Sequence, residues 1–288
     1  MSRLSFALVL LVGLLAGGLG SLLLRTGTDD TQLKAAIADV LAKQNAAKAA
    51  QTAAIDPGQD NKLIEDYLMS DPTILTRMND KLDAEKKVAE RKAMKDQLSA
   101  HSAEIYQSAD NVILGNPKGD VTLVEMFDYN CTYCRGALPD LATLMAEDPN
   151  LKVILKQFPI LSDGSVDAAR IAVLVGKDPK INYWDFHQKM FAERGEVGAS
   201  QALEVAAALG GNSAELMLDM NGKVATTAIQ AEYKLAKSLN IGGTPSYILG
   251  DEIIPGAVPI DQLRDKIANL RACGSTDCPA SSAPNPAG

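Results

Sequence analysis

The sequence is poor in the residues on which several classes of protein depend. It has two histidines, four cysteines and 5% aromatic residues in a chain of 288. Two histidines leave little room for a histidine-based metal site or for a Ser-His-Asp hydrolase. Four cysteines are too few to build a fold from disulfides, so we expect any role that they have to be specific.

Positive charge is also scarce. The chain has 28 Lys and Arg residues against 36 Asp and Glu, which gives a formal net charge of −8. A nucleic-acid-binding protein normally presents a basic surface, so we expect no nucleic-acid partner. The length is sufficient for one large or two small domains with a buried core.

One long apolar segment, residues 4–24, lies close to the start of the chain. It carries no charge and follows Arg3, a pattern typical of an export signal. The segment is also close in length to one membrane span, and no A-x-A-like cleavage site stands out after it. We expect residues 1–25 to be a cleaved signal peptide or a signal anchor; a buried helix is the alternative. Cysteines are oxidised outside the cytoplasm, so an exported cysteine pair is expected to be a disulfide or a disulfide catalyst.

Residues 30–107 are predicted to form a helical extension. Alanine, the best helix former, dominates residues 35–54, and further helices are predicted at 62–69 and from Pro72 toward Tyr106. The last of these has a narrow apolar stripe with heptad-like spacing: Leu75, Met78, Leu82 and Ala89. A long helix with a thin stripe buries little surface alone, which favours an oligomerisation stalk. A solvated linker is the alternative.

Residues 109–272 are predicted to form an α/β domain. Residues 121–129 are mostly apolar, as in a strand buried on both faces, and 151–158 repeat this pattern. Helical spacing begins at Cys131 between these two runs. Strand, helix and strand in this order form a βαβ unit.

The remaining elements of the domain are predicted from the Gly and Pro residues that separate them and from the spacing of their apolar residues. A long helical stretch occupies about 163–239, residues 246–249 and 252–254 form a hairpin, and a last helix covers 260–270. The tail, residues 273–288, is rich in Ser, Pro, Ala and Gly and is predicted to be disordered.

The segment Cys131-Thr132-Tyr133-Cys134 lies where a predicted strand passes into a helix. The free N–H groups and the dipole at a helix N-terminus favour an anion, and thus the thiolate form of Cys131. One helical turn brings Cys134 under Cys131, close enough for a small disulfide. Cys131 is therefore the expected nucleophile and Cys134 the resolving thiol.

The other cysteine pair favours a structural role. Zinc ribbons also contain C-x-x-C, but Cys273 and Cys278 are distant in sequence and differently spaced, so we expect no metal. In an oxidising compartment these two cysteines are expected to form a small local disulfide. Thiol–disulfide exchange needs no dissociable cofactor, and none is expected.

Five other residues are candidates. The Thr244–Pro245 bond precedes a predicted strand and is either a cis bond or an ordinary trans bond. Glu125 lies within the apolar strand, where an unpaired carboxylate is costly. It is either a buried acid with a raised pKa that exchanges protons with Cys134, or a side chain that reaches solvent or pairs with Lys156. Trp184 and His187 lie on an apolar helix face and are predicted to be core residues.

Four segments together resemble the periplasmic DsbA-like thiol:disulfide oxidoreductases of the thioredoxin superfamily. They are residues 127–135 (FDYNCTYCR), 157–161 (QFPIL), 183–187 (YWDFH) and 242–246 (GGTPS). The resemblance covers about 109–272. It implies a thioredoxin fold with an inserted helical domain, preceded here by the helical extension.

The resemblance also implies roles for individual residues. Cys131 and Cys134 would be the redox pair, Pro245 the cis-proline beside the active cysteine, and Thr244 the residue whose backbone binds an extended substrate. The family's buried acid falls on Glu125. Thr132 and Tyr133 replace the Pro-His dipeptide of the strongly oxidising members, so extreme oxidising power is not expected.

The extension resembles that of the stalked oligomeric members, which act as isomerases or reductases. The implied partners are cysteine-containing exported proteins and a redox partner that resets the active site, and a homo-oligomer would form through residues 30–107. The implied location is the periplasm, either free or tethered to the inner membrane by residues 4–24. The alternative function is a non-catalytic peptide-binding or assembly protein on the same fold.

Overall fold

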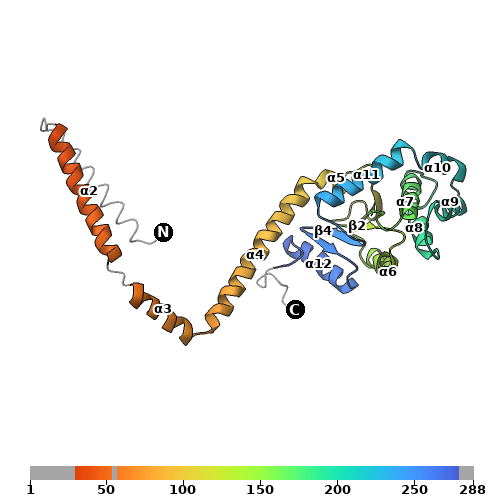
Figure 1. The fold of residues 1–288 in the computed structure, drawn as a ribbon. Helices are drawn as coiled ribbons and strands as arrows, with labels where there is room; N and C mark the ends of the chain where they lie inside the picture. Colours follow the sequence, from red (N-terminus) through yellow and green to blue (C-terminus); the bar gives the residue numbers. More distant parts are fainter. Residues whose placement is uncertain (1–29, 54–56, 279–288) are drawn as a thin grey trace. The chain divides into compact units, whose positions relative to one another are not determined.

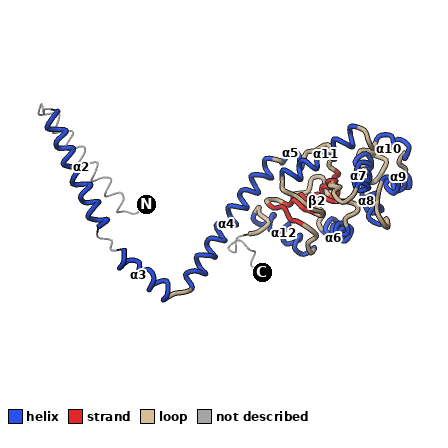
Figure 2. Tube along the Cα trace, in the orientation of Figure 1, coloured by secondary structure: helices blue, strands red, loops and turns tan. Residues whose placement is uncertain are grey.

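The computed structural model describes residues 30–53 and 57–278 (Figures 1 and 2). The predicted signal, residues 1–25, lies outside them. No helix among the described residues is both long and apolar enough to cross a membrane. The chain divides into two compact units, with the boundary between Lys81 and Leu82.

The described residues of the first unit are mostly helical. It contains α2 (Asp30–Ala53), α3 (Pro57–Ser70) and the first turns of α4 (Thr73–Ala100). Helix α3 begins earlier than predicted because Pro57 stands at the start of the helix, where its missing N–H costs nothing. Large apolar side chains on these helices are exposed to solvent, among them Leu63, Tyr67, Leu75 and Met78.

The second unit begins inside α4 and not near residue 109, where the domain boundary was expected. The helix predicted to run from Pro72 toward Tyr106 is two helices, α4 and α5 (Ser102–Tyr106), and the break falls at His101, whose ψ is 16°. Leu98 and Ile105 are buried in a core cluster against the sheet. The end of the extension is therefore part of the α/β domain.

The sheet has five strands in the order β1-β3-β2-β4-β5. The strands are β1 (Val112–Gly115), β2 (Val121–Phe127), β3 (Leu151–Gln157), β4 (Ser246–Leu249) and β5 (Glu252–Pro255). Strands β2 and β3 are parallel, and the other pairs are antiparallel. The predicted α/β fold class is confirmed, but β1 was not predicted. Four residues at a sheet edge carry little periodic signal, and their pairing with β3 makes them a strand.

Helices cover both faces of the sheet. On one face α6 (Thr132–Glu147) and α12 (Ile260–Cys273) bury Leu141 and Leu263 in a cluster with Leu123 and Phe127 of β2. On the other face α4, α5 and α11 (Lys223–Ser238) pack on Val124, Met126 and Ile154. Five helices lie between β3 and β4 in sequence: α7 (Asp163–Val175), α8 (Tyr183–Ala192), α9 (Ala199–Ala208), α10 (Ser213–Asp219) and α11 (Lys223–Ser238).

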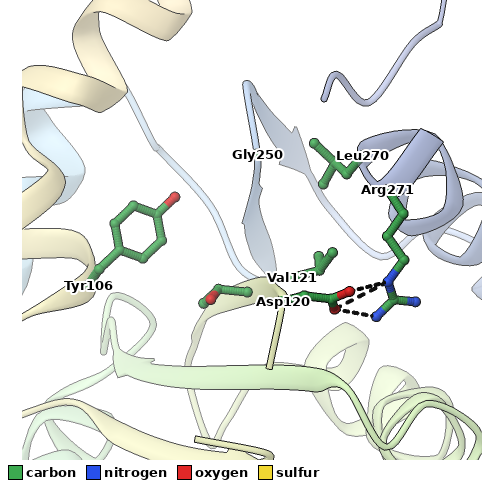
Figure 3. Close-up of a pocket in the computed structure, with 7 residues that line it drawn as sticks. Tyr106, Asp120, Val121, Gly250, Leu270 and Arg271 are labelled. Atoms are coloured by element: carbon green, nitrogen blue, oxygen red, sulfur yellow. Dashed lines mark hydrogen bonds and ion pairs between the residues drawn. The ribbon is translucent and has the colours of Figure 1, made fainter. Parts of the chain in front are cut away.

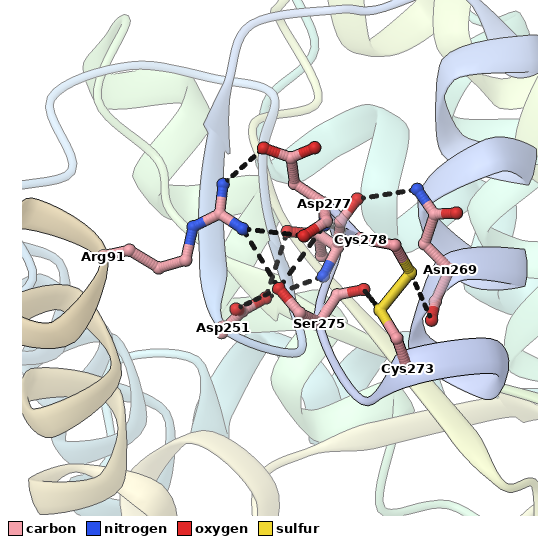
Figure 4. Close-up of a disulfide and its surroundings, with 8 residues drawn as sticks. Arg91, Asp251, Asn269, Cys273, Ser275, Asp277 and Cys278 are labelled. Carbon is pink, nitrogen blue, oxygen red and sulfur yellow. Dashed lines mark hydrogen bonds and ion pairs between the residues drawn. A yellow bond between two sulfur atoms is a disulfide. The ribbon is translucent and has the colours of Figure 1, made fainter. Parts of the chain in front are cut away.

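The start of the C-terminal tail is ordered, which corrects the prediction of disorder from residue 273. A disulfide joins Cys273 and Cys278 (Figure 4). Asp251 accepts hydrogen bonds from the backbone N–H and the hydroxyl of the buried Thr276, at 2.9 and 3.0 Å. The guanidinium of Arg91 on α4 donates to Ser275 at 3.1 Å and to Asp277 at 2.8 Å. The disulfide closes a loop that polar contacts then fasten to α4 and to the β4–β5 turn.

Removing this disulfide should lower the free energy of unfolding by about 2 kcal/mol, the entropy expected from closing so short a loop. The measurement is urea denaturation of Cys273→Ser/Cys278→Ser in a Cys131→Ser/Cys134→Ser background. Reductant should then lower the stability of the background protein to that of the quadruple variant, because only the tail disulfide is left to reduce. Equal stability with and without the tail disulfide would contradict this prediction.

Candidate functional site

The two cysteines of C-x-x-C lie at the start of α6, directly after β2. The side chain of Cys131 caps the helix: its Sγ accepts a hydrogen bond from the backbone N–H of Cys134 at 3.4 Å. Both residues are free cysteines, and Cys131 is 5% exposed. Between them Thr132 and Tyr133 are exposed. A sulfur that accepts from a helix N-terminus is placed where negative charge is favoured.

The Thr244–Pro245 bond is cis and lies beside Cys131. The thiol of Cys131 donates a hydrogen bond to the carbonyl oxygen of Thr244 at 3.2 Å. Strand β4 begins directly after Pro245 and pairs with β2, with Ser246 opposite Met126. The pairing of the two strands therefore brings the proline loop to the end of β2, where the cysteines are.

Glu125 is a buried acid. It lies in the middle of the sheet, is 4% exposed, and makes no hydrogen bond or ion pair with any residue in the described part of the chain. Burial raises the pKa of its carboxyl from 4.5 to about 8. Glu125 stands opposite Leu155 in β3, and the next residue, Lys156, points to the other face.

Lys156 has a different partner, which overturns the alternative of a Glu125–Lys156 pair. Its ammonium group is fully buried and donates to Glu232 of α11 at 3.0 Å, to Asn111 at 2.8 Å and to the carbonyl of Glu104 at 2.9 Å. Three acceptors account for all three N–H bonds of the lysine. The sheet thus keeps its buried ion pair on one face and its lone buried acid on the other.

Glu125 shares its face of β2 with the inner cysteine. Burial raises the pKa of the Cys134 thiol well above its ordinary value, and the negative charge of Glu125 raises it further. Tyr247 of β4 stands directly across from Glu125, and burial together with the Glu125 charge raises the pKa of its phenol. The charge of Glu125 therefore disfavours the ionised form of the Cys134 thiol, and burial disfavours that of Glu125 itself.

Two residues of the turn between β2 and α6 hold the site in place, and neither was predicted. The buried Asp128 accepts hydrogen bonds from the backbone of Asn130, Ile160 and Leu161 at 2.8–3.0 Å. Asn130 donates to Ser165 and exchanges two hydrogen bonds with the backbone of Val197, at 2.9 and 2.7 Å. Asp and Asn are common in turns, which was the available signal, but their partners lie far away in sequence.

His187 is a core residue, as predicted. Its ring packs edge-on against Phe127 with ring centroids 4.7 Å apart and against Phe191 at 4.9 Å. Its Nδ1 lies 3.3 Å from the hydroxyl of Tyr129, and Trp184 stacks on it. Burial lowers the pKa of the imidazole to about 3, so the ring is neutral at physiological pH. The described residues contain no cluster of three or more His, Cys, Asp or Glu that could hold a metal.

A cavity of about 550 Å³ lies away from the cysteines, at the start of β2 (Figure 3). Tyr106, Thr122 and Gly250 line it together with Arg271. The Arg271 guanidinium is occupied, because it donates to Asp120 at 2.7 Å and to Asp148 at 2.8 Å. None of the predicted site residues contributes to this cavity.

Comparison with known proteins identifies the domain. Residues 122–268, about half of the chain, match the DSBA-like thioredoxin domain. The chain belongs to the DsbA-like thioredoxin family. Disulfide bond formation protein D of Bacillus subtilis is 23% identical over 168 residues, which cover 54% of this chain and 74% of that protein.

Two solved structures extend this similarity. A thioredoxin-like oxidoreductase from Silicibacter pomeroyi is 36% identical, with a TM-score of 0.56 over 59% of this chain and 96% of its own. ScsC from Proteus mirabilis, in a compact conformation, is 27% identical with a TM-score of 0.55, over 75% of this chain and 98% of its own. Membership of the DsbA-like family supports thiol:disulfide oxidoreductase chemistry at the C-x-x-C site.

The buried acid should make stability depend on pH. The folded chain keeps the Glu125 proton up to about pH 8 and the unfolded chain releases it near pH 4.5. The free energy of unfolding should therefore fall as pH rises through this window, because the unfolded chain binds fewer protons there. Glu125→Gln should be more stable than the parent at pH 8 by several kcal/mol, at about 1.4 kcal/mol per pKa unit, and similar to it below pH 4.5.

Urea denaturation at a series of pH values checks this prediction. Glu204→Gln, an exposed position on α9, is the matched control and should follow the parent at every pH. Parallel stability profiles for Glu125→Gln and the parent would contradict a raised pKa at Glu125.

Proposed function

We propose that this chain is an exported thiol:disulfide oxidoreductase that forms, reduces or isomerises disulfides in extracytoplasmic proteins through Cys131 and Cys134. The observation that carries the proposal is the position of the Cys131 sulfur. It lies between the N–H groups that begin α6 and the carbonyl of Thr244, next to a cis-proline. This arrangement places the sulfur at a helix N-terminus and beside a backbone edge that a substrate can approach.

Disulfide formation starts from the Cys131–Cys134 disulfide. A substrate thiolate attacks the Cys131 sulfur, forms a mixed disulfide and releases Cys134 as a thiolate. A second substrate thiolate attacks the substrate sulfur of the mixed disulfide, which creates the substrate disulfide and releases the Cys131 thiolate. The enzyme gains two electrons, and a partner protein that carries a disulfide must accept them to complete the cycle.

Isomerisation and reduction start from the reduced pair. The Cys131 thiolate attacks a substrate disulfide and releases one substrate thiolate. In isomerisation that thiolate, or another on the substrate, displaces Cys131 and forms a different substrate disulfide, with no net transfer of electrons. In reduction Cys134 displaces the substrate, and a dithiol partner restores the enzyme.

Glu125 supports the steps in which Cys134 changes its protonation state. When Cys134 leaves as a thiolate it sits in a buried site beside Glu125, and the carboxylic acid can supply its proton. In the reductive direction the carboxylate removes the proton from the Cys134 thiol before it attacks. The role assigned to Glu125 is therefore that of proton donor and acceptor to Cys134.

Two features support an exported enzyme. Residues 1–25 have the composition of a signal, and the Cys273–Cys278 disulfide belongs in an oxidising compartment. The substrates are accordingly cysteine-containing exported proteins in the periplasm. Residues 4–24 either remain as a membrane span that tethers the enzyme or are removed with a cleaved signal peptide.

Single substitutions of the two cysteines test the chemistry. In an assay that follows oxidation of a reduced protein substrate, Cys131→Ser should fall to the uncatalysed background because it removes the nucleophile. Cys134→Ser, given a substrate that contains a disulfide, should attack it through Cys131 and accumulate the mixed disulfide, because the resolving thiol is absent; this is visible as a mass increase that reductant reverses. A parent that oxidises the substrate no faster than Cys131→Ser would exclude this enzyme and favour a non-catalytic binding protein.

We also propose that the helical extension, residues 30–107, forms a homo-oligomer, with α4 in the interface. Leu75, Met78 and Leu82 are exposed, and their spacing places them on one side of α4. Such a stripe is stabilised by a second helix that covers it. An oligomer would hold several redox sites close together, which suits repeated attack on a misfolded substrate.

The stripe can be tested by introducing charge. The full chain should have a solution mass that is a multiple of the monomer mass, and Leu75→Asp/Met78→Asp/Leu82→Asp should be monomeric in light scattering. Val88→Asp is the control, because Val88 is exposed on α4 outside the stripe. A monomeric parent, or an oligomer that the triple variant leaves intact, would contradict the proposal.

A further inference from the structure

A cavity of about 530 Å³ lies between helix α4 and the disulfide-closed loop of the tail, and none of its lining residues belongs to the redox site. A volume of this size is in the range of sites that bind small molecules. Cys278, which is half-buried, lines the cavity, whereas its disulfide partner Cys273 does not. The side that faces the disulfide is formed by four basic residues of α4: Lys87, Arg91, Lys92 and Lys95.

The cavity carries an excess of positive charge, although the chain as a whole has a net charge of −8. Two acidic residues, Asp251 and Asp277, also line it, but Asp277 pairs with Arg91 at 2.8 Å and Asp251 accepts hydrogen bonds from the tail loop. Lys87 and Lys95 are exposed and form no ion pair or hydrogen bond within the part of the chain that the structure describes. Two uncompensated ammonium groups beside a disulfide sulfur attract a negatively charged reagent.

The disulfide-closed loop fastens α4 to the β4–β5 turn. Arg91 reaches from α4 to the loop (Figure 4) and donates to the Ser275 hydroxyl at 3.1 Å and to the carbonyl and carboxylate of Asp277 at 3.1 and 2.8 Å. From the turn, Asp251 accepts hydrogen bonds from Ser275 and Thr276 at 2.7–3.0 Å. The closed ring of the disulfide restricts the loop to the conformation that makes these contacts.

We propose that the Cys273–Cys278 disulfide is a second thiol–disulfide site, which accepts electrons from a small anionic thiol at Cys278 and holds α4 only while it is oxidised. The basic cavity selects the reagent by its charge, and the tail loop transmits the redox state to α4 through Arg91. This inference goes beyond the proposed function, because it uses neither Cys131 nor Cys134.

The reaction is a reduction in two exchange steps. The thiolate of the reagent attacks the Cys278 sulfur, the bond between the two cysteine sulfurs breaks, and Cys273 leaves as a thiolate that takes a proton from water. A second reagent thiolate attacks the reagent sulfur of the mixed disulfide and releases Cys278 as a thiolate. The protein disulfide gains two electrons, and two reagent molecules are oxidised to one disulfide. Opening the ring allows the loop to leave Arg91 and Asp251, so α4 loses this attachment.

The charge preference of the reduction tests the site. In the full chain with Cys131→Ser/Cys134→Ser, only the tail cysteines are left, so alkylation and mass spectrometry measure their reduction directly. The probes are mercaptoethanesulfonate, which is anionic, and cysteamine, which is cationic. Lys87→Glu/Lys95→Glu should lower the ratio of the two reduction rates roughly tenfold at low ionic strength, because attraction of the anion becomes repulsion. The intrinsic reactivities of the two thiols cancel in this comparison.

A matched control separates the cavity from the charge of the whole chain. Lys189→Glu/Lys223→Glu reverses two exposed lysines outside the cavity, changes the net charge equally, and should keep the parent ratio. Salt at about 1 M should lower the ratio in the unaltered cavity, because it screens the lysines. A ratio that Lys87→Glu/Lys95→Glu leaves unchanged, or that the control lowers equally, would overturn the proposal. A tail disulfide that neither thiol reduces would overturn it too.

Hydrogen exchange tests the hold on α4. When the same Cys131→Ser/Cys134→Ser protein is reduced, the backbone amides of residues 84–95 should exchange severalfold faster, while those of α9 should not change. Arg91→Gln should produce part of this increase in the oxidised protein, because it removes the ion pair with Asp277 and leaves the ring closed. Equal exchange of residues 84–95 before and after reduction would overturn the proposal.

Discussion

The site depends on the register of β2 between β3 and β4. This strand is buried on both faces, so each side chain is committed to one side of the sheet, and a slip by one residue would exchange the two sides. In the observed register Glu125 faces the core that contains Cys134, and Met126 pairs with Ser246, which follows the cis-proline. The acid, the cysteines and the proline loop are therefore positioned by one set of backbone hydrogen bonds.

Burial then gives similar residue types different chemistry. Glu232 is buried beside a lysine ammonium, which offsets in part the burial that raises the pKa of its carboxyl, whereas Glu125 has no such partner. A carboxyl without a partner is the one that can hold and release a proton near neutral pH. His187 is buried among aromatic rings and stays neutral, so it contributes packing and one hydrogen bond rather than acid–base chemistry.

Helix α4 changes its environment along its length. Its earlier residues, such as Leu75 and Met78, expose apolar side chains, while Leu98 near its end is part of a core cluster under the sheet. The same helix also carries Met94 beside the proline loop and Arg91 on the disulfide-closed loop. We infer that the extension contributes to the surface around the redox site as well as preceding it in sequence.

The sequence by itself determined the elements whose signal is local. The apolar runs predicted β2 and β3, and the change of pattern at Cys131 predicted that it stands at a helix N-terminus; the structure shows both. Local sequence patterns could not predict β1, because it is a strand only through its pairing with β3. They could not predict the ordered loop after Cys273 either, because hydrogen bonds to Asp251 and Arg91 hold it in place. Only the tertiary structure decided that Lys156 pairs with Glu232, because the alternation of a strand sends neighbouring side chains to opposite faces and their partners come from distant helices. For the same reason the sequence did not reveal that Asp128 and Asn130 fix the turn between β2 and α6. Their hydrogen-bond partners, at residues 160–165 and 197, are distant in sequence and come close only in the folded domain.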